Sequence, residues 1–187
     1  AEAETAKEGQ WLDGPKTDFF DAVNRTFKAP KIIAEDLGII DDGVIDLLKK
    51  TQLPCMRVMQ FAFMEGKDNM HMPHNYPKNC CAYTGTHDNS TIMQWYREAD
   101  PKSRAMARRY VKPRLFERFS AACVRVVYAS PANLAIIPMQ DILGLGADAR
   151  MNVPSTVGGN WKWRMLPGRL TASRAEKLRS LADTYFR

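Results

Sequence analysis

Four short apolar runs, separated by segments with helical spacing, constrain the fold of this chain more than any other feature of its sequence. The runs occupy residues 31–34, 56–63, 80–84 and 134–138. They have the length and composition of buried strands, and each is followed by a loop or a helical segment. Strands that alternate with helices pair in parallel, so this order predicts an α/β fold built on a parallel sheet.

The segments between the runs indicate helices, over 17–28, over 41–50, from about 90, over 103–129 with a break at Pro113, and from Ser173 onward. Asp41 or Asp42 is predicted to cap the second of these, and Ser173 with Glu176 has the spacing of a capping box. A complete eight-stranded barrel needs about 250 residues, whereas this chain has 187. The pattern therefore predicts either a small open sheet or a piece of a larger enzyme.

Composition narrows the class of protein. Hydrophobic residues make up 45% of the chain and charged residues 26%, as in globular proteins. No apolar run approaches the roughly 20 residues that span a bilayer, and the acidic first residues lack the apolar core of an export signal. The chain does not begin with Met, so we expect it to start inside a longer protein.

The cysteines and the basic residues have structural interpretations. No C-x-x-C pair occurs among the four cysteines, so we expect reduced core residues and a cytoplasmic location. The net charge is +6, with basic residues concentrated between Arg104 and Arg125. Aromatic residues do not interleave with them as a nucleic-acid surface requires, so a solvated helix face is favoured.

Acidic residues and a histidine follow two of the apolar runs. Glu35 and Asp36 come directly after the first run, and His87, Asp88 and Asn89 come shortly after the third. The carboxyl ends of parallel strands form the edge that carries the chemistry in (β/α) barrels. Two carboxylates there would suit acid/base work and charge stabilisation in sugar chemistry. Each group alone could equally cap a helix, but two such groups at equivalent strand ends favour a functional site.

Other polar and aromatic residues are less specific. His71 and His74 have H-x-x-H spacing, but a proline between them prevents a regular helix and no acidic cluster adjoins them, so no metal site is predicted. The segment 73–77 is better suited to polar contacts with a ligand. Trp161 and Trp163 could stack on sugar faces or anchor a core, and the sequence leaves both open.

Several longer motifs occur in one order along residues 9 to 164. They are Ile33–Gly38, Gln60–Phe63, His74–Pro77, Tyr83–Asn89, Pro138–Gly146, Arg150–Asn152 and Asn160–Arg164. At these motifs the chain resembles the 4-α-glucanotransferase family, whose members are also called amylomaltase or disproportionating enzyme and belong to the α-amylase clan.

The resemblance implies a (β/α)8 TIM barrel, of which residues 1–187 would supply about the C-terminal half, strands five to eight, with no second domain. It implies a retaining double displacement that moves α-1,4-glucan segments between malto-oligosaccharides. No cofactor or metal is implied. The expected partners are α-1,4-glucans, malto-oligosaccharides and the remaining N-terminal part of the barrel, with no nucleic acid or membrane.

The resemblance also assigns roles to residues. Glu35 matches the family's acid/base, Asp88 its transition-state stabiliser, and His87 a neighbouring sugar-hydroxyl ligand. On loops that should face the same cleft we expect further sugar ligands at His74, Asn75 and Asn89. The family's nucleophile is an Asp in an Arg-x-Asp-His motif upstream of the acid/base. This chain lacks the motif, so we expect it to be inactive alone.

Two other functions remain open from the sequence. A retaining α-glucan hydrolase would use the same carboxylates with water as acceptor. A non-enzymatic domain would bind glucan through its tryptophans or RNA through its basic helices.

Overall fold

The computed structural model divides the chain into two compact units, Ala1–Pro54 and Cys55–Arg187. The residues that it describes are 7, 9, 10, 12–38, 40–64 and 66–187. In the part of the chain so described, no helix is both long enough and apolar enough to cross a membrane.

The first unit contains two helices that pack together, α1 (Thr17–Thr26) and α2 (Asp42–Thr51). The predicted cap of α2 is confirmed at Asp41, whose Oδ1 accepts a hydrogen bond from Val44 N at 2.9 Å. This bond satisfies one of the backbone donors that a helix leaves open at its start. Neither helix contains a buried residue among those described.

The predicted strand over 31–34 is wrong. The segment is irregular in the structure, and a backbone hydrogen bond from Ala34 N to the carbonyl of Pro54 (2.9 Å) holds its end. Pro54 has no N–H to contribute to a ladder. Apolar composition alone does not make a strand, because a strand exists only where a neighbouring segment pairs with its backbone.

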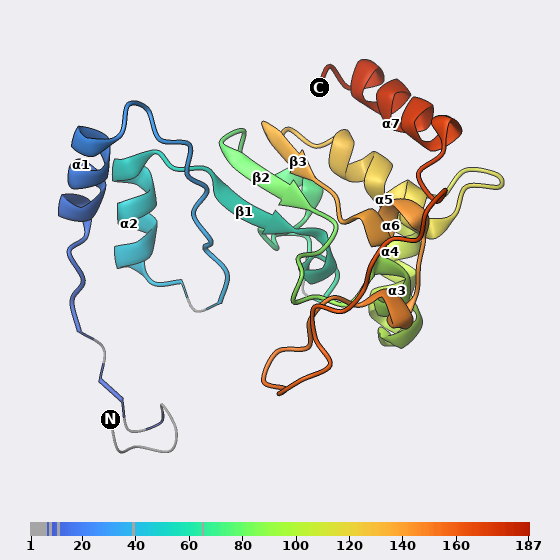
Figure 1. Cartoon of the computed structure of the whole chain (residues 1–187), viewed down its shortest axis with the longest axis horizontal. Helices are drawn as coiled ribbons and strands as arrows, with labels where there is room; N and C mark the ends of the chain where they lie inside the picture. The colour runs from blue at the N-terminus through green and yellow to red at the C-terminus, as the bar shows by residue number, and fades with distance from the viewer. Residues whose placement is uncertain (1–6, 8, 11, 39, 65) are drawn as a thin grey trace. The chain divides into compact units, whose positions relative to one another are not determined.

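A parallel sheet of three strands forms the centre of the second unit (Figure 1). Its strands are β1 (Cys55–Val58), β2 (Cys80–Tyr83) and β3 (Leu134–Ile136). They lie in sequence order, with Cys55 opposite Cys80 and Cys81 opposite Leu134. The parallel α/β architecture is confirmed, with three of the four predicted strands present in the described residues.

The strands are shorter than predicted. The second apolar run, 56–63, leaves the sheet after Val58 and turns into the 3-10 helix Met59–Phe61. The fourth run, 134–138, ends as a strand at Ile136. β1 and β2 are almost entirely buried, as in parallel sheets covered on both faces. Leu134 and Ile136 on β3 are instead close to half exposed.

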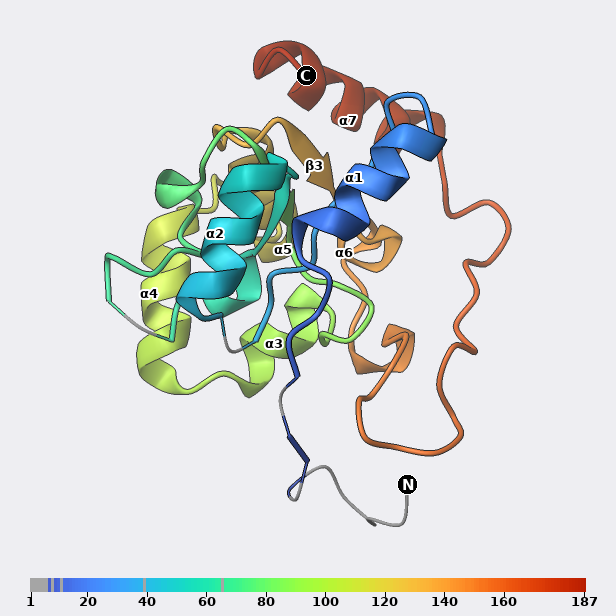
Figure 2. The same cartoon turned by 90° about the vertical axis from the view of Figure 1, so that its left-hand side faces the viewer.

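Helices from the second unit cover one side of the sheet, as Figures 1 and 2 both show. They are α3 (Ile92–Glu98), α4 (Pro101–Val111), α5 (Phe119–Tyr128) and α6 (Met139–Leu143). The helix predicted over 103–129 is thus two helices. The break comes where predicted, since Lys112 adopts a left-handed conformation (φ 45°) directly before Pro113.

One of the basic residues has a structural role in that break. The Arg125 guanidinium donates to both carboxylate oxygens of Glu117 at 2.9 Å and also to the carbonyl of Val111. These hydrogen bonds hold the pKa of Glu117 below its usual range. Arg125 therefore ties α5 to the end of α4, while Arg108 and Arg109 are exposed as expected for a solvated face.

The last helix, α7 (Ala172–Thr184), begins at a different cap from the predicted one. Thr171 Oγ1 accepts from Arg174 N at 3.3 Å, so the capping box predicted at Ser173 is wrong. Thr171 comes earlier in the chain and provides the same hydroxyl acceptor. At the other end, Arg187 donates to the carbonyls of Tyr128 and Ser130, which ties the C-terminal residue to the end of α5.

The four cysteines are all buried, as predicted for core residues. Burial raises the pKa of the Cys81 thiol, and raises that of the Cys123 thiol further. A thiol whose pKa is raised is mostly protonated and unreactive, so these residues act as small core side chains.

Candidate functional site

The loop between β2 and α3, residues 84–91, carries three of the predicted site residues, His87, Asp88 and Asn89. It leaves the carboxyl end of the sheet, the edge expected for a site. The side chains of His87 and Asp88 are 51% and 49% exposed, so a ligand can reach them.

Hydrogen bonds within the loop set its shape. Asn89 Oδ1 accepts from Thr86 N at 2.8 Å and from Thr86 Oγ1 at 2.9 Å. Asp88 N in turn donates to Thr86 Oγ1 at 3.3 Å. The amide oxygen of Asn89 is therefore used inside the protein, and a role in sugar binding would fall to its amide nitrogen.

The Asp88 carboxylate is oriented by the segment that follows α6. Asn152 Nδ2 donates to Asp88 Oδ1 at 2.6 Å, and Arg150 Nη2 donates to the Asp88 carbonyl at 2.8 Å. Arg150 Nε donates to the Asn152 carbonyl at 2.9 Å, so the two donors are themselves linked. The carboxylate is accessible and also fixed in direction, which charge stabilisation requires.

His87 lies between this carboxylate and an exposed tryptophan. Its Nε2 is 3.4 Å from Asp88 Oδ1, which gives an ion pair when the imidazole is protonated. Its ring centroid lies 5.0 Å from the ring centroid of Trp161, with 37° between the planes. Trp161 is 53% exposed, so the core interpretation is wrong for this residue. Stacking on a sugar stays a prediction.

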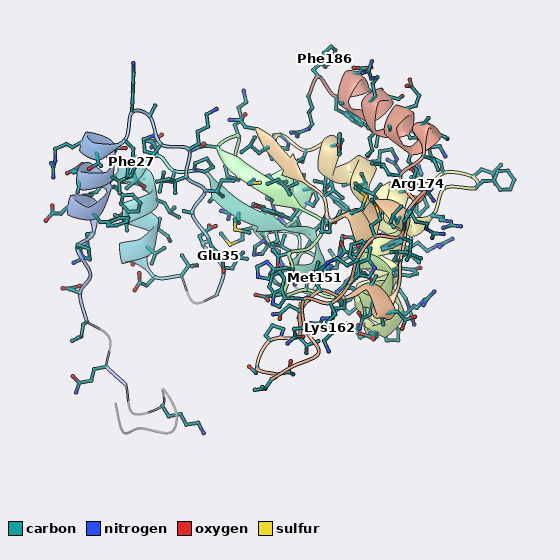
Figure 3. The ribbon with its side chains drawn as sticks, viewed as in Figure 1. Phe27, Glu35, Met151, Lys162, Arg174 and Phe186 are labelled. Carbon is teal, nitrogen blue, oxygen red and sulfur yellow. The ribbon has the colours of Figure 1, made fainter. Side chains whose placement is uncertain are left out.

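The segment that carries Trp161 folds back on itself. Trp161 N donates to the Met151 carbonyl at 2.7 Å, and Figure 3 shows Met151 close to Lys162. Trp161 adopts a positive φ of 62°, which is uncommon for a residue with a side chain. Trp163 is half-buried and lines a separate cavity of about 290 Å³ with Leu143 and Arg164 among others.

Gln60 joins the loop after β1 to the loop after β2. Its Nε2 donates to the Ser90 carbonyl at 2.7 Å, and Ser90 Oγ donates to Gln60 Oε1 at 3.3 Å. A Cβ at Gly85 would lie 2.4 Å from Gln60 Nε2. Only glycine allows the amide to approach this closely, so the two loops are packed against one another.

Asp141, on α6, is a buried carboxylate beside the same loop and is 1% exposed. Its Oδ2 accepts from Thr84 Oγ1 at 2.5 Å and its Oδ1 accepts from Ile92 N at 2.8 Å. Burial raises the pKa of Asp141 to about 6, although the two hydrogen bonds act to lower it.

His74 and Asn75 lie in the 3-10 helix Pro73–Asn75, and both side chains are exposed. His74 Nδ1 is 2.9 Å from the Tyr110 hydroxyl of α4, which also accepts from His74 N at 3.2 Å. Asn75 Nδ2 donates to the carbonyls of Lys67 and Asn69, at 2.9 Å each. These contacts hold the residues in place, and sugar binding by either stays a prediction.

Glu35 is exposed and lies on the segment that joins α1 to α2 (Figure 3). Its neighbour Asp36 is 5% exposed. Glu35 belongs to the first unit and Asp88 to the second, so the predicted approach of the two carboxylates stays a prediction.

The sequence interpretation missed four polar residues that hold the 84–91 loop, namely Gln60, Asp141, Arg150 and Asn152. All four lie in the motifs that carry the family resemblance, without assigned roles. The available signal was position, because Asp141 comes shortly after the fourth apolar run, as Glu35 comes after the first, and Gln60 is a polar residue within the second.

Comparisons with known proteins agree on one family. Residues 1–171 match the family model described as 4-alpha-glucanotransferase. The chain is 42% identical over 191 residues to the chloroplastic/amyloplastic 4-alpha-glucanotransferase of Arabidopsis thaliana, covering 100% of this chain and 33% of that protein. It is 43% identical over 188 residues to the 4-alpha-glucanotransferase of Streptococcus pneumoniae, covering 100% of this chain and 37% of that protein.

A solved structure matches as well. The amylomaltase of Streptococcus agalactiae, solved in complex with acarbose, superposes with a TM-score of 0.93 at 37% identity. The match covers 99% of this chain and 38% of that one. The chain thus spans between 33% and 38% of the length of these three relatives.

Proposed function

The chain belongs to the 4-alpha-glucanotransferase family, and on that premise we propose that it supplies the C-terminal part of a (β/α)8 barrel that transfers α-1,4-glucan segments between malto-oligosaccharides. The parallel strands β1 to β3 with their helices support such a part. In the described sheet the edge strand β3 pairs only with β2, and its open backbone edge supports a further strand beside it.

The observation that carries the proposal is the fixed, accessible carboxylate of Asp88. Retaining glucan transfer passes through a transition state with positive charge on the sugar ring. The Asp88 carboxylate accepts from Asn152, and the Asp88 backbone carbonyl accepts from Arg150, so this carboxylate at the carboxyl end of the sheet can meet that charge without reorganising. Asp88 is therefore proposed as the charge stabiliser.

Glu35 is the proposed acid/base. Its protonated carboxyl gives a proton to the leaving glucan oxygen while the nucleophile, supplied by the N-terminal part of the barrel, forms the glycosyl–enzyme bond. The Glu35 carboxylate then takes the proton of the acceptor 4-hydroxyl as that oxygen displaces the nucleophile. Retention requires the acid and nucleophile carboxyls to lie about 5–5.5 Å apart.

The glucan contacts are proposed at the surface around Asp88. His87 would bind a sugar hydroxyl, and the exposed face of Trp161 beside it would contact the apolar face of a ring. His74, Asn75 and Asn89 are the further proposed ligands. The acarbose complex of the Streptococcus agalactiae amylomaltase supports an oligosaccharide-type ligand for this fold.

The remaining N-terminal part of the barrel is the proposed protein partner, and the cytoplasm is the proposed location. The burial of all four cysteines as core side chains supports a reducing compartment. The Arabidopsis thaliana relative is named chloroplastic/amyloplastic, so the location of the reaction differs within the family.

The test uses the complete polypeptide that contains this chain, with maltotriose as the only substrate. We expect longer oligosaccharides to appear, and Asp88→Asn to lower their rate of formation by about 100-fold to 1,000-fold. Asp183→Asn, on the exposed surface of α7, is the control and should leave the rate unchanged. Release of only glucose and maltose would establish a hydrolase instead.

A further inference from the structure

One buried carboxylate contacts both ends of the loop that carries Asp88. Thr84, directly after β2, donates its hydroxyl to Asp141 Oδ2, and Ile92, the first residue of α3, donates its backbone N–H to Asp141 Oδ1. Thr84 and Ile92 are both 0% exposed. Both oxygens of one carboxylate therefore join the two points where the loop leaves and re-enters regular structure.

We propose that Asp141 is a positioning residue for glucan transfer, which holds the 84–91 loop by its two ends so that Asp88 faces the reacting sugar. The inference rests on the proposed function of Asp88. Asp141 itself is buried beneath the loop and acts only through Thr84 and Ile92.

The two donors that meet at this side chain are best matched by a carboxylate. A carboxylate accepts two hydrogen bonds at once, one from a hydroxyl and one from a backbone N–H that helix geometry leaves without a partner. An asparagine has one acceptor oxygen, so its amide N–H would donate to the Thr84 hydroxyl, which reverses that hydrogen bond and leaves the hydroxyl proton without its acceptor. A shape-conserving substitution therefore disturbs one end of the loop while the core stays filled.

The other supports of the loop act at different points. Gln60 binds the Ser90 carbonyl, and Arg150 and Asn152 bind Asp88 itself. None of these contacts touches Thr84 or Ile92. Loss of the Asp141 contacts should therefore shift Asp88 without unfolding the loop.

The surroundings of Asp141 make its protonation visible in a pH profile. Burial places its pKa near 6, and the hydrogen bonds come from Thr84 on the β2 side and from Ile92 on α3. On α5 the titratable neighbour is the fully buried Cys123 thiol, which in turn interacts with Arg125 and Glu117. When Asp141 takes up a proton, one of its oxygens becomes a donor and the pair of acceptors is lost.

The experiment compares three variants of the complete polypeptide. Thr84→Val removes one hydroxyl at constant shape, Asp141→Asn removes the charge, and Ser130→Ala is the control. The control also removes a buried hydroxyl, which donates to the Val127 carbonyl at 2.7 Å at the end of α5, away from the 84–91 loop. The rate of maltotriose disproportionation is measured from pH 5 to 8 and gives kcat and KM. Separately, the rate of backbone amide hydrogen exchange is measured in the peptide that contains Ile92.

We expect Thr84→Val and Asp141→Asn to lower kcat by about tenfold to a hundredfold with little change in KM, as misplacement by about 1 Å does. Asp141→Asn, which changes the acceptor of the Ile92 N–H, should also remove the acid limb near pH 6 and speed exchange at Ile92. Ser130→Ala should match wild type in all three measurements.

Folded Thr84→Val and Asp141→Asn enzymes with wild-type kcat and an unchanged pH profile would overturn the inference. If the Asp88→Asn enzyme were nevertheless inactive, the proposed function of Asp88 would stand and only the positioning role of Asp141 would fall. The inference would also be overturned if both variants had a lower melting temperature and less active enzyme but an unchanged kcat per active site. That result would show a purely structural role for Asp141.

Discussion

The two acidic residues proposed for the chemistry are held in very different ways. Asp88 sits on a loop that Gln60, Asp141 and Asn152 contact from three segments of the second unit. Glu35 is itself exposed and sits on an irregular stretch of the first unit, next to the backbone hydrogen bond from Ala34 N to the Pro54 carbonyl. The difference shows that a carboxylate is fixed in direction when polar side chains from distant segments hold it or its loop. The direction of a carboxylate on a segment that pairs with no strand is set by whatever packs against that segment.

The largest expected effect is the difference in activity and in aggregation between the isolated chain and the assembled barrel. The isolated 187 residues should show no measurable transferase activity and should aggregate, because the edge strand β3 exposes Leu134 and Ile136 and no nucleophile motif is present. Light scattering and maltotriose elongation measure both properties. A monodisperse, cooperatively melting chain that elongates maltotriose would contradict the half-barrel proposal.

Substituting the two acids separates their roles. In the complete polypeptide, Glu35→Gln should lower transfer from maltotriose by several orders of magnitude, because both proton steps are lost. α-Glucosyl fluoride needs little acid assistance, so glycosylation from that donor should be affected less. Asp88→Asn should impair both donors alike, since charge stabilisation acts on either. Equal losses on both donors for Glu35→Gln would count against the acid role.

A smaller effect is expected at His87, which borders Asp88 and Trp161 on the well-held loop. His87→Ala should lower kcat/KM by about tenfold to a hundredfold, the loss typical of one hydrogen bond to a charged or polar partner in the transition state. The melting temperature should hardly change, because the side chain is half exposed. A sharp fall in melting temperature with full activity of the remaining folded enzyme would make His87 a structural residue.

The last expected effect is on stability and not on rate, and is a change of stability with pH at Asp141. Its pKa rises from 3.8 in the unfolded chain to about 6 in the folded protein because of burial. The folded state therefore binds a proton more tightly between these values, and stability falls as pH rises through that window. Relative to Asp141→Asn, wild type should lose up to about 3 kcal/mol between pH 4 and pH 7.

Urea unfolding of both proteins at several pH values measures this difference in unfolding free energy. The other titratable groups are the same in both proteins, so their contributions cancel in the difference. A difference that stays constant from pH 4 to pH 7 would show that Asp141 does not titrate in this range. The thiol of Cys123, which faces Asp141, is protonated throughout and does not contribute to the slope.

Local patterns in the sequence were sufficient for much of this protein. Alternating apolar runs and helical spacing predicted the parallel sheet, and the helix cap at Asp41 and the break at Pro113 were placed correctly. The motifs around Glu35 and Asp88 are short runs of neighbouring residues, and they indicated the family to which the chain belongs. Such features depend on residues a few positions apart, which is why the sequence by itself determines them.

Tertiary structure decided which polar groups meet. Thr84 and Asp141 are 57 residues apart in the chain, and Asp88 and Asn152 are 64 apart, yet each pair is hydrogen-bonded. It also decided that segment 31–34 is not a strand in the described residues, because a strand requires a paired neighbour and apolar side chains do not supply one. Contacts of this kind depend on the path of the whole chain, and no local pattern contains that path.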